Sequence, residues 1–219
     1  MGKPLLVWTV EVAKKSGVFE RIILMTDDEK IAEIGRQYGA EVPFMEPEEF
    51  AGDKVYVAEP LKYTLGRLKE EENFSPDFFV LLEPSCPGRT PEHIKEVVEI
   101  FSKSDADSIL GVSELPARFN PAKALKIQEN GRLTHISGLP FYQVPHQNQF
   151  VGKLYFINSA IYAFKTANLF TGDKNLWGKK TIPYVMDIKY AMDIDTPDDY
   201  VIAEVKFKKL LKENNRLSG

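Results

Sequence analysis

Segments typical of strands and helices alternate through the first half of this 219-residue chain. Apolar residues follow helical spacing over residues 4–16 and 57–72. The run 21–25 is strand-like, and 78–82 is apolar on both faces, as expected of a buried parallel strand. This alternation predicts an α/β fold, in which helices cover both faces of a sheet.

Capping signals predict where several of these helices begin and end. Gly17 and Gly39 are expected to stop the first two helices, because glycine readily adopts the left-handed backbone that often follows a helix. A capping box at 26–29 predicts the start of the second helix. The Thr-Pro-Glu sequence at 90–92 predicts a further helix that runs to about residue 102.

The second half of the chain has a different character. Its regular elements are predicted as strands at 107–112, 158–164 and 182–186, and a last helix at about 198–215. Two short strands are expected to form a hairpin around the Glu-Asn-Gly turn at 129–131. Residues 137–155 are predicted to be an irregular excursion, long enough to contact a ligand or a partner subunit. We expect residues 1–219 to form one domain that includes this excursion.

Composition limits the classes of function. The chain is 43% hydrophobic and 27% charged, which is ordinary for a globular protein with a sizeable core. Its net charge of −4 argues against nucleic-acid binding as the main task. The single cysteine, Cys86, excludes an internal disulfide. We see no apolar run of membrane length and no signal peptide, so the cytoplasm is the expected location.

Asp193-Ile194-Asp195 is the main candidate for metal-dependent chemistry. Carboxylates two residues apart on a strand point to the same face, and Mg²⁺ commonly binds one or two carboxylates together with substrate phosphates. The next residues have the pattern of a helix start, since Thr196 suits the N-cap and Pro197 the first helical position. The alternative is that these acids, with Asp198 and Asp199, only cap the helix and face solvent.

Residues 83–90 directly follow the predicted strand at 78–82, at the edge of the sheet where α/β proteins bind ligands. Glu83 can accept hydrogen bonds from a sugar, and Arg89 can bind a phosphate or a carboxylate. The alternative is a simple turn in which these two side chains pair with each other. We interpret Cys86 as a small buried thiol, because no His/Asn partner of a catalytic cysteine is recognisable.

Two further groups of residues could line a ligand pocket. Leu176 and Trp177 form an apolar patch in a polar loop, and they act either as a core anchor or as a lid over a small ligand. Asn158 and Tyr162 share one predicted strand and could line a polar pocket. The alternative is an ordinary strand with tyrosine cross-strand contacts.

Several blocks together resemble the acylneuraminate cytidylyltransferases, that is, the CMP-sialic acid synthetases and their relatives. The similarity extends along nearly the whole chain, and the order and spacing of the blocks make it specific. The most characteristic blocks are Ile23-Leu24-Met25-Thr26-Asp27-Asp28-Glu29, Leu81-Leu82-Glu83-Pro84-Ser85-Cys86-Pro87-Gly88-Arg89-Thr90, Asn158-Ser159-Ala160-Ile161-Tyr162 and Met192-Asp193-Ile194-Asp195-Thr196. The resemblance implies a Rossmann-like nucleotide-diphospho-sugar transferase sheet with a dimerisation excursion.

The resemblance also implies a reaction. A hydroxyl of a nine-carbon sugar acid attacks the α-phosphate of CTP, and pyrophosphate leaves. In the family the aspartate pair holds Mg²⁺, which corresponds to Asp193 and Asp195. The family's sugar-acid pocket corresponds to Glu83, Asn148-Gln149, Tyr162 and Leu176-Trp177. The excursion reaches the other subunit in the family, so a homodimer is implied.

The sequence departs from the family pattern in its phosphate and substrate contacts. The family opens with a strand and an Ala-Arg-x-Gly-Ser-Lys-Gly type loop, and this sequence starts just after that loop. The family positions that read the cytosine are Glu46 and Val57, and a sugar-pocket arginine is Asn148. Each lost cation removes a charge-assisted hydrogen bond worth roughly 1.5–3 kcal/mol.

Three hypotheses follow from the sequence. The first is a cytidylyltransferase that activates a sialic-acid-like sugar acid for surface glycans. The second is a catalytically weak homologue that acts as a dimerising or regulatory partner. The third keeps the fold but changes the substrate to 3-deoxy-octulosonate.

Overall fold

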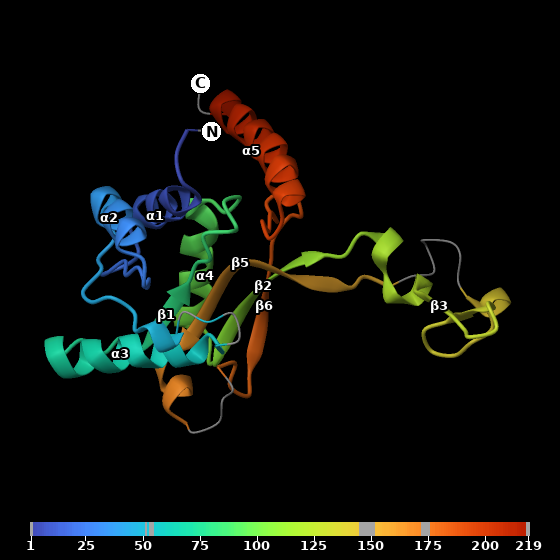
Figure 1. The fold of residues 1–219 in the computed structure, drawn as a ribbon, viewed down its shortest axis with the longest axis horizontal. Helices are drawn as coiled ribbons and strands as arrows, with labels where there is room; N and C mark the ends of the chain where they lie inside the picture. Colours follow the sequence, from blue (N-terminus) through green and yellow to red (C-terminus); the bar gives the residue numbers. More distant parts are fainter. Residues whose placement is uncertain (1, 51, 53–54, 145–151, 172–175, 218–219) are drawn as a thin grey trace.

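The computed structural model describes residues 2–50, 52, 55–144, 152–171 and 176–217 (Figure 1). The strands of its main sheet lie in the order β1 (Phe78–Leu81), β5 (Tyr155–Lys165), β2 (Ser108–Glu114) and β6 (Thr181–Val185). β5 runs antiparallel to both of its neighbours, whereas β2 and β6 are parallel. The predicted α/β class is therefore confirmed, with a mixed sheet.

One orientation predicted from the sequence is wrong. The run at 78–82 was expected to be a buried parallel strand, yet β1 pairs antiparallel with β5 and is only half-buried. Among the described residues no strand pairs with the other edge of β1. Apolar residues on both faces predicted a central strand. In the sheet that the described residues form, β1 lies at the edge.

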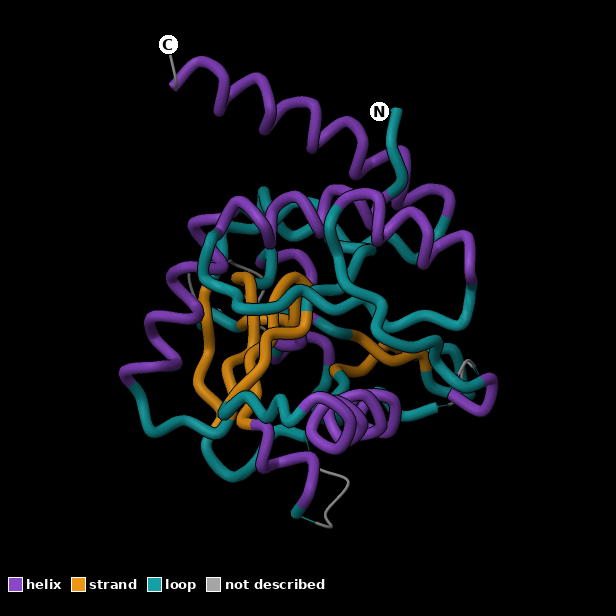
Figure 2. Tube along the Cα trace, turned by 90° about the vertical axis from the view of Figure 1, so that its left-hand side faces the viewer, coloured by secondary structure: helices purple, strands orange, loops and turns teal. Residues whose placement is uncertain are grey.

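Helices cover both faces of the sheet, as predicted (Figure 2). Side chains alternate along β5, so Ile161 and Ala163 pack with α4 (Pro91–Lys103), which also contacts α1 (Leu5–Ser16). Tyr162 and Phe164 point to the opposite face and pack with α3 (Ala58–Glu72). The two apolar layers fix the sheet between the helices.

The predicted helix ends are largely confirmed. Gly17 and Gly39 follow α1 and α2 (Glu29–Tyr38) with φ of 65° and 93°, in the left-handed region. Thr90 caps α4 in a capping box with His93. The N-cap of α2 is Asp28 rather than the predicted Thr26, because the Asp28 carboxylate accepts the backbone N–H groups at the helix start.

The predicted strand at 21–25 is reduced to a single bridge, between Ile23 and Glu41. The Leu24 N–H donates to the Glu41 carbonyl at 2.8 Å, and the Glu41 N–H donates to the Ile22 carbonyl at 2.7 Å. In a parallel ladder the next donor would be the N–H of Pro43, which proline lacks. The pairing therefore ends after these two bonds.

The irregular middle of the chain forms an arm, residues 115–144 and 152–154, which extends away from the sheet (Figure 1). The predicted hairpin is confirmed in it as β3 (Leu125–Ile127) and β4 (Leu133–His135), joined by a turn in which Gly131 has φ 77°. Apolar side chains on the arm are exposed, including Ile127 at 73% and Tyr142 at 79%. Residues 145–151 of the predicted excursion lie outside the described part.

The C-terminal helix α5 (Pro197–Leu217) begins as predicted. Thr196 and Asp199 form reciprocal bonds at its start, since each accepts a backbone N–H from the other and the Thr196 hydroxyl donates to Asp199 at 2.7 Å. The Phe207 ring meets the Trp8 ring of α1 edge-on, with centroids 4.8 Å apart. No helix in the described residues combines the length and apolarity that crossing a membrane requires.

Candidate active site

The loop after β1 and the segment before α5 meet at one end of the sheet. The Ser85 hydroxyl lies 3.3 Å and the Cys86 thiol 3.5 Å from Asp193 Oδ1, and both donate to it. A β-carbon at Gly88 would lie 2.2 Å from the Tyr190 carbonyl oxygen, so the two backbones are in direct contact. The structure therefore brings together the two segments that the sequence marked as functional.

Asp193 and Asp195 do not lie on a strand, as the spacing argument assumed. They belong to the irregular link between β6 and α5, and both are exposed. Glu83 is half-buried and lies close enough to Asp193 and Asp195 for both charges to affect its pKa. Burial, then Asp193 and more weakly Asp195, raise the pKa of Glu83, while Arg89 opposes the shift. Three carboxyl groups therefore share this end of the sheet.

The donor set of the aspartate pair suits a hard cation. Neither Asp193 nor Asp195 forms an ion pair within 4.0 Å with any described side chain, so carboxylate oxygens remain available. The described residues contain no cluster of three or more His, Cys, Asp or Glu side chains arranged to hold a metal. Two carboxylates agree with the way Mg²⁺ binds, since it usually takes its other ligands from water and substrate phosphates.

Cys86 is buried, as the sequence interpretation predicted. Burial, followed by the nearby Asp193 charge, raises the pKa of its thiol to about 12. A thiol with this pKa is protonated at neutral pH and is therefore a hydrogen-bond donor rather than a nucleophile.

Arg89 lies in the interior, only 2% exposed, beneath the loop that contains it. Its guanidinium donates to the backbone carbonyls of Glu83 and Ala160 and to the Thr9 hydroxyl. Burial lowers its pKa to about 10, and its Nε has no hydrogen-bond partner among the described residues. Arg89 therefore stabilises the loop from the interior, and it does not take the position for binding a phosphate or a ligand carboxylate that the sequence predicted. The alternative prediction, pairing with the Glu83 side chain, is also wrong, because Arg89 binds the Glu83 backbone carbonyl.

Asn158 is also buried and bonded within the protein. Its side chain donates to Ser113 Oγ at 3.0 Å and accepts the Ala160 N–H at 3.1 Å. Next to it, Ser159 has a positive φ of 54°, and the pairing of β5 with β2 shifts register here. Asn158 therefore stabilises a bulge in β5. The sequence had predicted that it lines a polar pocket.

The aromatic residues predicted to line the pocket form part of the core. The Tyr162 and Trp177 rings meet edge-on at 5.9 Å, and the Trp177 and Phe164 rings lie 5.1 Å apart. Leu176 is buried in the same apolar cluster. Of the two interpretations of Leu176 and Trp177, the core anchor is the one the structure shows. Tyr162 is buried, and burial, followed by the charges of Glu83 and Asp193, raises the pKa of its hydroxyl, while a hydrogen bond with Ser159 lowers it.

The remaining sequence candidates are Asn148, Gln149, Glu46 and Val57. Gln149 and Asn148 lie outside the described residues. Glu46 is partly buried near Asp27, and burial and that charge raise its pKa. Val57 is exposed at the start of α3.

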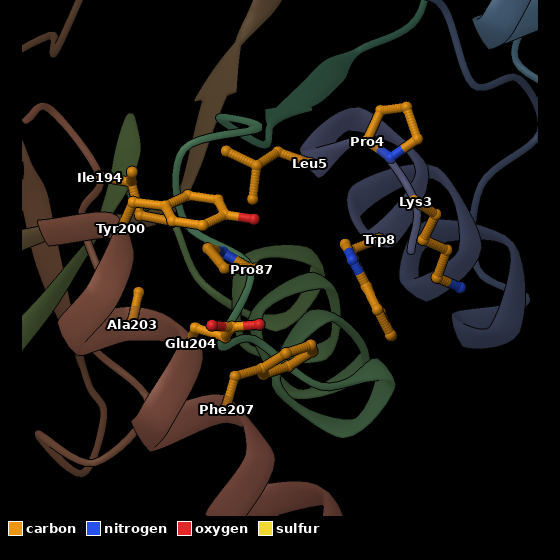
Figure 3. Close-up of a pocket in the computed structure, with 10 residues that line it drawn as sticks. All are labelled: Lys3, Pro4, Leu5, Trp8, Pro87, Ile194, Tyr200, Ala203, Glu204 and Phe207. Atoms are coloured by element: carbon orange, nitrogen blue, oxygen red, sulfur yellow. The ribbon is translucent and has the colours of Figure 1, made fainter. Parts of the chain in front are cut away.

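A pocket of about 140 Å³ borders the aspartate link (Figure 3). Trp8 and Phe207 form one side and Tyr200 and Ile194 the other, with Pro87 between them. Ile194 separates the two aspartates and Pro87 belongs to the loop that contacts Asp193, so the pocket adjoins the candidate site. The sequence did not indicate this pocket, because its walls come from three distant segments.

Ser85 and Gly88 are the site residues that the sequence analysis missed. Both lie in the loop 83–90, which the sequence had marked as a candidate. No nearby residue indicated that their partners would be Asp193 and Tyr190. A small residue at each position was the available signal, since small side chains allow two backbones to approach closely.

Comparison with known proteins identifies the family of the chain. A family model described as cytidylyltransferase matches residues 1–204. The chain is 31% identical over 204 residues to a CMP-N,N'-diacetyllegionaminic acid synthase of Legionella pneumophila, covering 93% of this chain and 84% of that protein. It is 30% identical over 204 residues to an N-acylneuraminate cytidylyltransferase of Escherichia coli, covering 92% of this chain and 45% of that protein.

Among solved structures, a CMP:2-keto-3-deoxy-manno-octonic acid synthetase complexed with CTP has a similar fold. The TM-score is 0.66 at 14% identity, and the match covers 97% of this chain and 90% of that chain. At this identity the similarity concerns the fold alone. The sequence relatives and the family model, by contrast, confirm the resemblance found in the sequence, and the chain belongs to the cytidylyltransferase family.

Proposed function

We propose that this chain transfers the cytidylyl group of CTP to a hydroxyl of a nine-carbon sugar acid and releases pyrophosphate. The observation that carries the proposal is the docking of the Asp193 carboxylate against the loop after β1, beside Glu83 and near Asp195. Relatives named CMP-N,N'-diacetyllegionaminic acid synthase and pseudaminic acid cytidylyltransferase support the substrate class.

We further propose that Asp193 and Asp195 hold Mg²⁺. Bound there, the ion would neutralise phosphate charge during nucleotidyl transfer. Asp193 is held by its two donors, so its orientation is set before any ligand binds. Half-buried Glu83, with its raised pKa, is suited to hydrogen-bond a sugar hydroxyl beside the aspartates. Gln149 remains a proposed sugar contact from the sequence resemblance.

A homodimer is proposed for the assembled enzyme, because the arm extends from the sheet with exposed apolar side chains that a second copy could cover. Light scattering with size-exclusion chromatography tests this. We expect a dimer for the parent protein and a shift to monomer for Ile127→Lys. A parent protein that is monomeric at assay concentrations would contradict the proposal. The cytoplasm stays the proposed location.

The activity is tested by pyrophosphate release with CTP, Mg²⁺ and a panel of acid sugars. The panel contains N-acetylneuraminic, legionaminic, pseudaminic and 3-deoxy-octulosonic acids. We expect turnover with a nine-carbon acid and preference for CTP over UTP. Turnover only with the eight-carbon acid would shift the substrate class, and no turnover together with no CTP-dependent thermal shift would refute the enzyme proposal.

A further inference from the structure

Two donors hold one oxygen of the Asp193 carboxylate. The Ser85 hydroxyl and the Cys86 thiol both donate to Oδ1, at 3.3 Å and 3.5 Å. The hydroxyl distance is longer than the roughly 2.5–3.0 Å typical of O–H···O hydrogen bonds, and the thiol distance reflects the larger radius of sulfur. In the described part of the chain no hydrogen bond to Oδ2 is present, so this oxygen is the one left for a ligand.

Ser85 and Cys86 belong to a loop that contacts in the protein interior hold in place. Buried Arg89 binds the carbonyl at the start of the loop, that of Glu83, and the Ala160 carbonyl of β5. Gly88 contacts the Tyr190 backbone, and Cys86 is buried within the apolar layer under α4. Ser85 and Cys86 therefore offer their donors from positions that cannot easily shift.

The alternative partners of these donors are more distant. The Cys86 thiol lies 3.8 Å from the Asn158 carbonyl, compared with 3.5 Å from Asp193 Oδ1. The Ser85 hydroxyl lies 3.9 Å from the Cys86 sulfur, compared with 3.3 Å from the same carboxylate oxygen. Geometry thus favours Asp193 as the shared acceptor.

We propose that Ser85 and Cys86 are positioning residues, which orient the Asp193 carboxylate so that its Oδ2 binds the divalent cation. This inference rests on the cation site of the proposed function. An exposed aspartate loses side-chain freedom when it binds an ion, and donors that fix it beforehand remove part of that cost. Partners of this kind typically change metal affinity 10–100-fold when they are removed.

The test measures cation binding directly as well as turnover. Mn²⁺ binding to the intact protein is followed by electron paramagnetic resonance, and initial rates are recorded as a function of Mg²⁺. We expect Ser85→Ala and Cys86→Ala each to weaken Mn²⁺ binding and to raise the Mg²⁺ needed for half-maximal rate by roughly 10-fold or more. The KM for CTP at saturating Mg²⁺ should not change.

Conservative variants separate positioning from packing. Ser85→Thr and Cys86→Ser keep a donor and should bind Mn²⁺ nearly as the parent does. Val97→Ala removes buried volume from the same apolar layer without contacting Asp193, so it should lower the melting temperature but not the Mn²⁺ affinity. If Val97→Ala weakens Mn²⁺ binding as much as Cys86→Ala does, the effect is structural and the inference is overturned.

The outcomes distinguish this inference from the proposed function. A parent protein that turns over, with Ser85→Ala and Cys86→Ala variants that bind Mn²⁺ normally, refutes positioning alone. A parent that binds Mn²⁺ through these donors but releases no pyrophosphate refutes the activity and leaves positioning intact. A parent that neither binds Mn²⁺ nor turns over refutes both.

Discussion

Gly88 and Tyr190 bring the two halves of the site into backbone contact, since a β-carbon on Gly88 would lie 2.2 Å from the Tyr190 carbonyl oxygen. The obstacle is backbone, so it cannot rotate away as a side chain could. Tyr190 lies three residues before Asp193, and any shift of this contact therefore moves the proposed cation ligand.

Gly88→Ala should separate the two segments. We expect it to destabilise the fold by about 1–3 kcal/mol, the usual cost of overpacking, and to reduce turnover. Denaturant unfolding and initial rates measure the two effects. Gly66→Ala is the matched control, because nothing lies within 4 Å of its added β-carbon in α3, and it should stabilise by roughly 0.5–1 kcal/mol. A Gly88→Ala protein with parental stability would contradict the contact.

Asp193→Ala should abolish turnover, or lower it by at least 100-fold, on the order of the loss seen when one electrostatic group is removed from an active site. The control is Asp198→Ala, which changes an exposed acid in the first turn of α5. That variant should keep full activity and lose about 0.3–1 kcal/mol of stability from the helix dipole. Both are compared by pyrophosphate release, and an active Asp193→Ala enzyme would disprove the assignment.

Arg89→Met should destabilise the protein rather than change its KM for CTP. The substitution removes the side-chain donor from the buried Ala160 carbonyl, at a cost of about 1–3 kcal/mol. The Glu83 carbonyl also loses its bond from Arg89 but keeps the Cys86 N–H as a donor at 3.2 Å. Thermal unfolding and steady-state kinetics separate the two effects. A large rise in the KM of a well-folded Arg89→Met variant would return Arg89 to the substrate contact predicted from the sequence.

Glu83→Gln should make the cation-free protein more stable at neutral pH. Burial raises the folded-state pKa of Glu83, so its favourable contribution is complete below the unfolded pKa of about 4.3 and is lost as the pH rises through the folded value. Glutamine does not ionise and avoids that loss. Melting temperatures should therefore differ at pH 7–8 and converge below pH 4, whereas a constant difference would contradict the titration.

The Glu71→Gln variant provides a contrast of opposite sign. In the parent protein, the hydrogen bond that Arg67 donates to Glu71 lowers the pKa of Glu71, so the carboxylate stabilises the fold above the unfolded pKa. Glu71→Gln should lower the melting temperature slightly at neutral pH. This pair of variants tests the direction of each shift within one protein.

His93→Gln should remove an acid-sensitive contribution to stability. The Thr90 N–H donates to His93 Nδ1 at 3.1 Å, and burial lowers the pKa of His93 despite Glu92 and Glu96, with Lys189 adding to the shift. The neutral ring therefore contributes stability above its unfolded pKa of about 6.5, and that contribution is lost as the pH falls through the folded value.

The Tyr184 and Tyr190 rings also pack against His93, with centroids 6.2 Å and 4.6 Å away. Glutamine keeps the capping-box acceptor and does not titrate, so the variant should lose less stability than the parent between pH 7 and pH 5. The difference should be about 1 kcal/mol, the usual value of a helix cap. Equal pH profiles would show that His93 is not the titrating group.

Local chemistry was enough to predict most elements. Gly17 and Gly39 ended their helices because few other residues accept their backbone conformation, and Thr90 began α4 through its own side chain. Alternating apolar residues in β5 determined which side chains face each helix layer. These signals lie within a few residues of their effect, so one sequence suffices to read them.

The tertiary structure decided the contacts over long separations. The sequence determined that residues 83–90 and the aspartate pair were candidates, but Ser85 and Asp193 are 108 positions apart, and only the fold shows that they bond. The orientation of β1 and the burial of Arg89 depended on the placement of β5, which runs antiparallel beside β1 and supplies the Ala160 carbonyl. Periodicity reports which face a residue occupies, whereas strand order and partner choice follow from how all elements pack together.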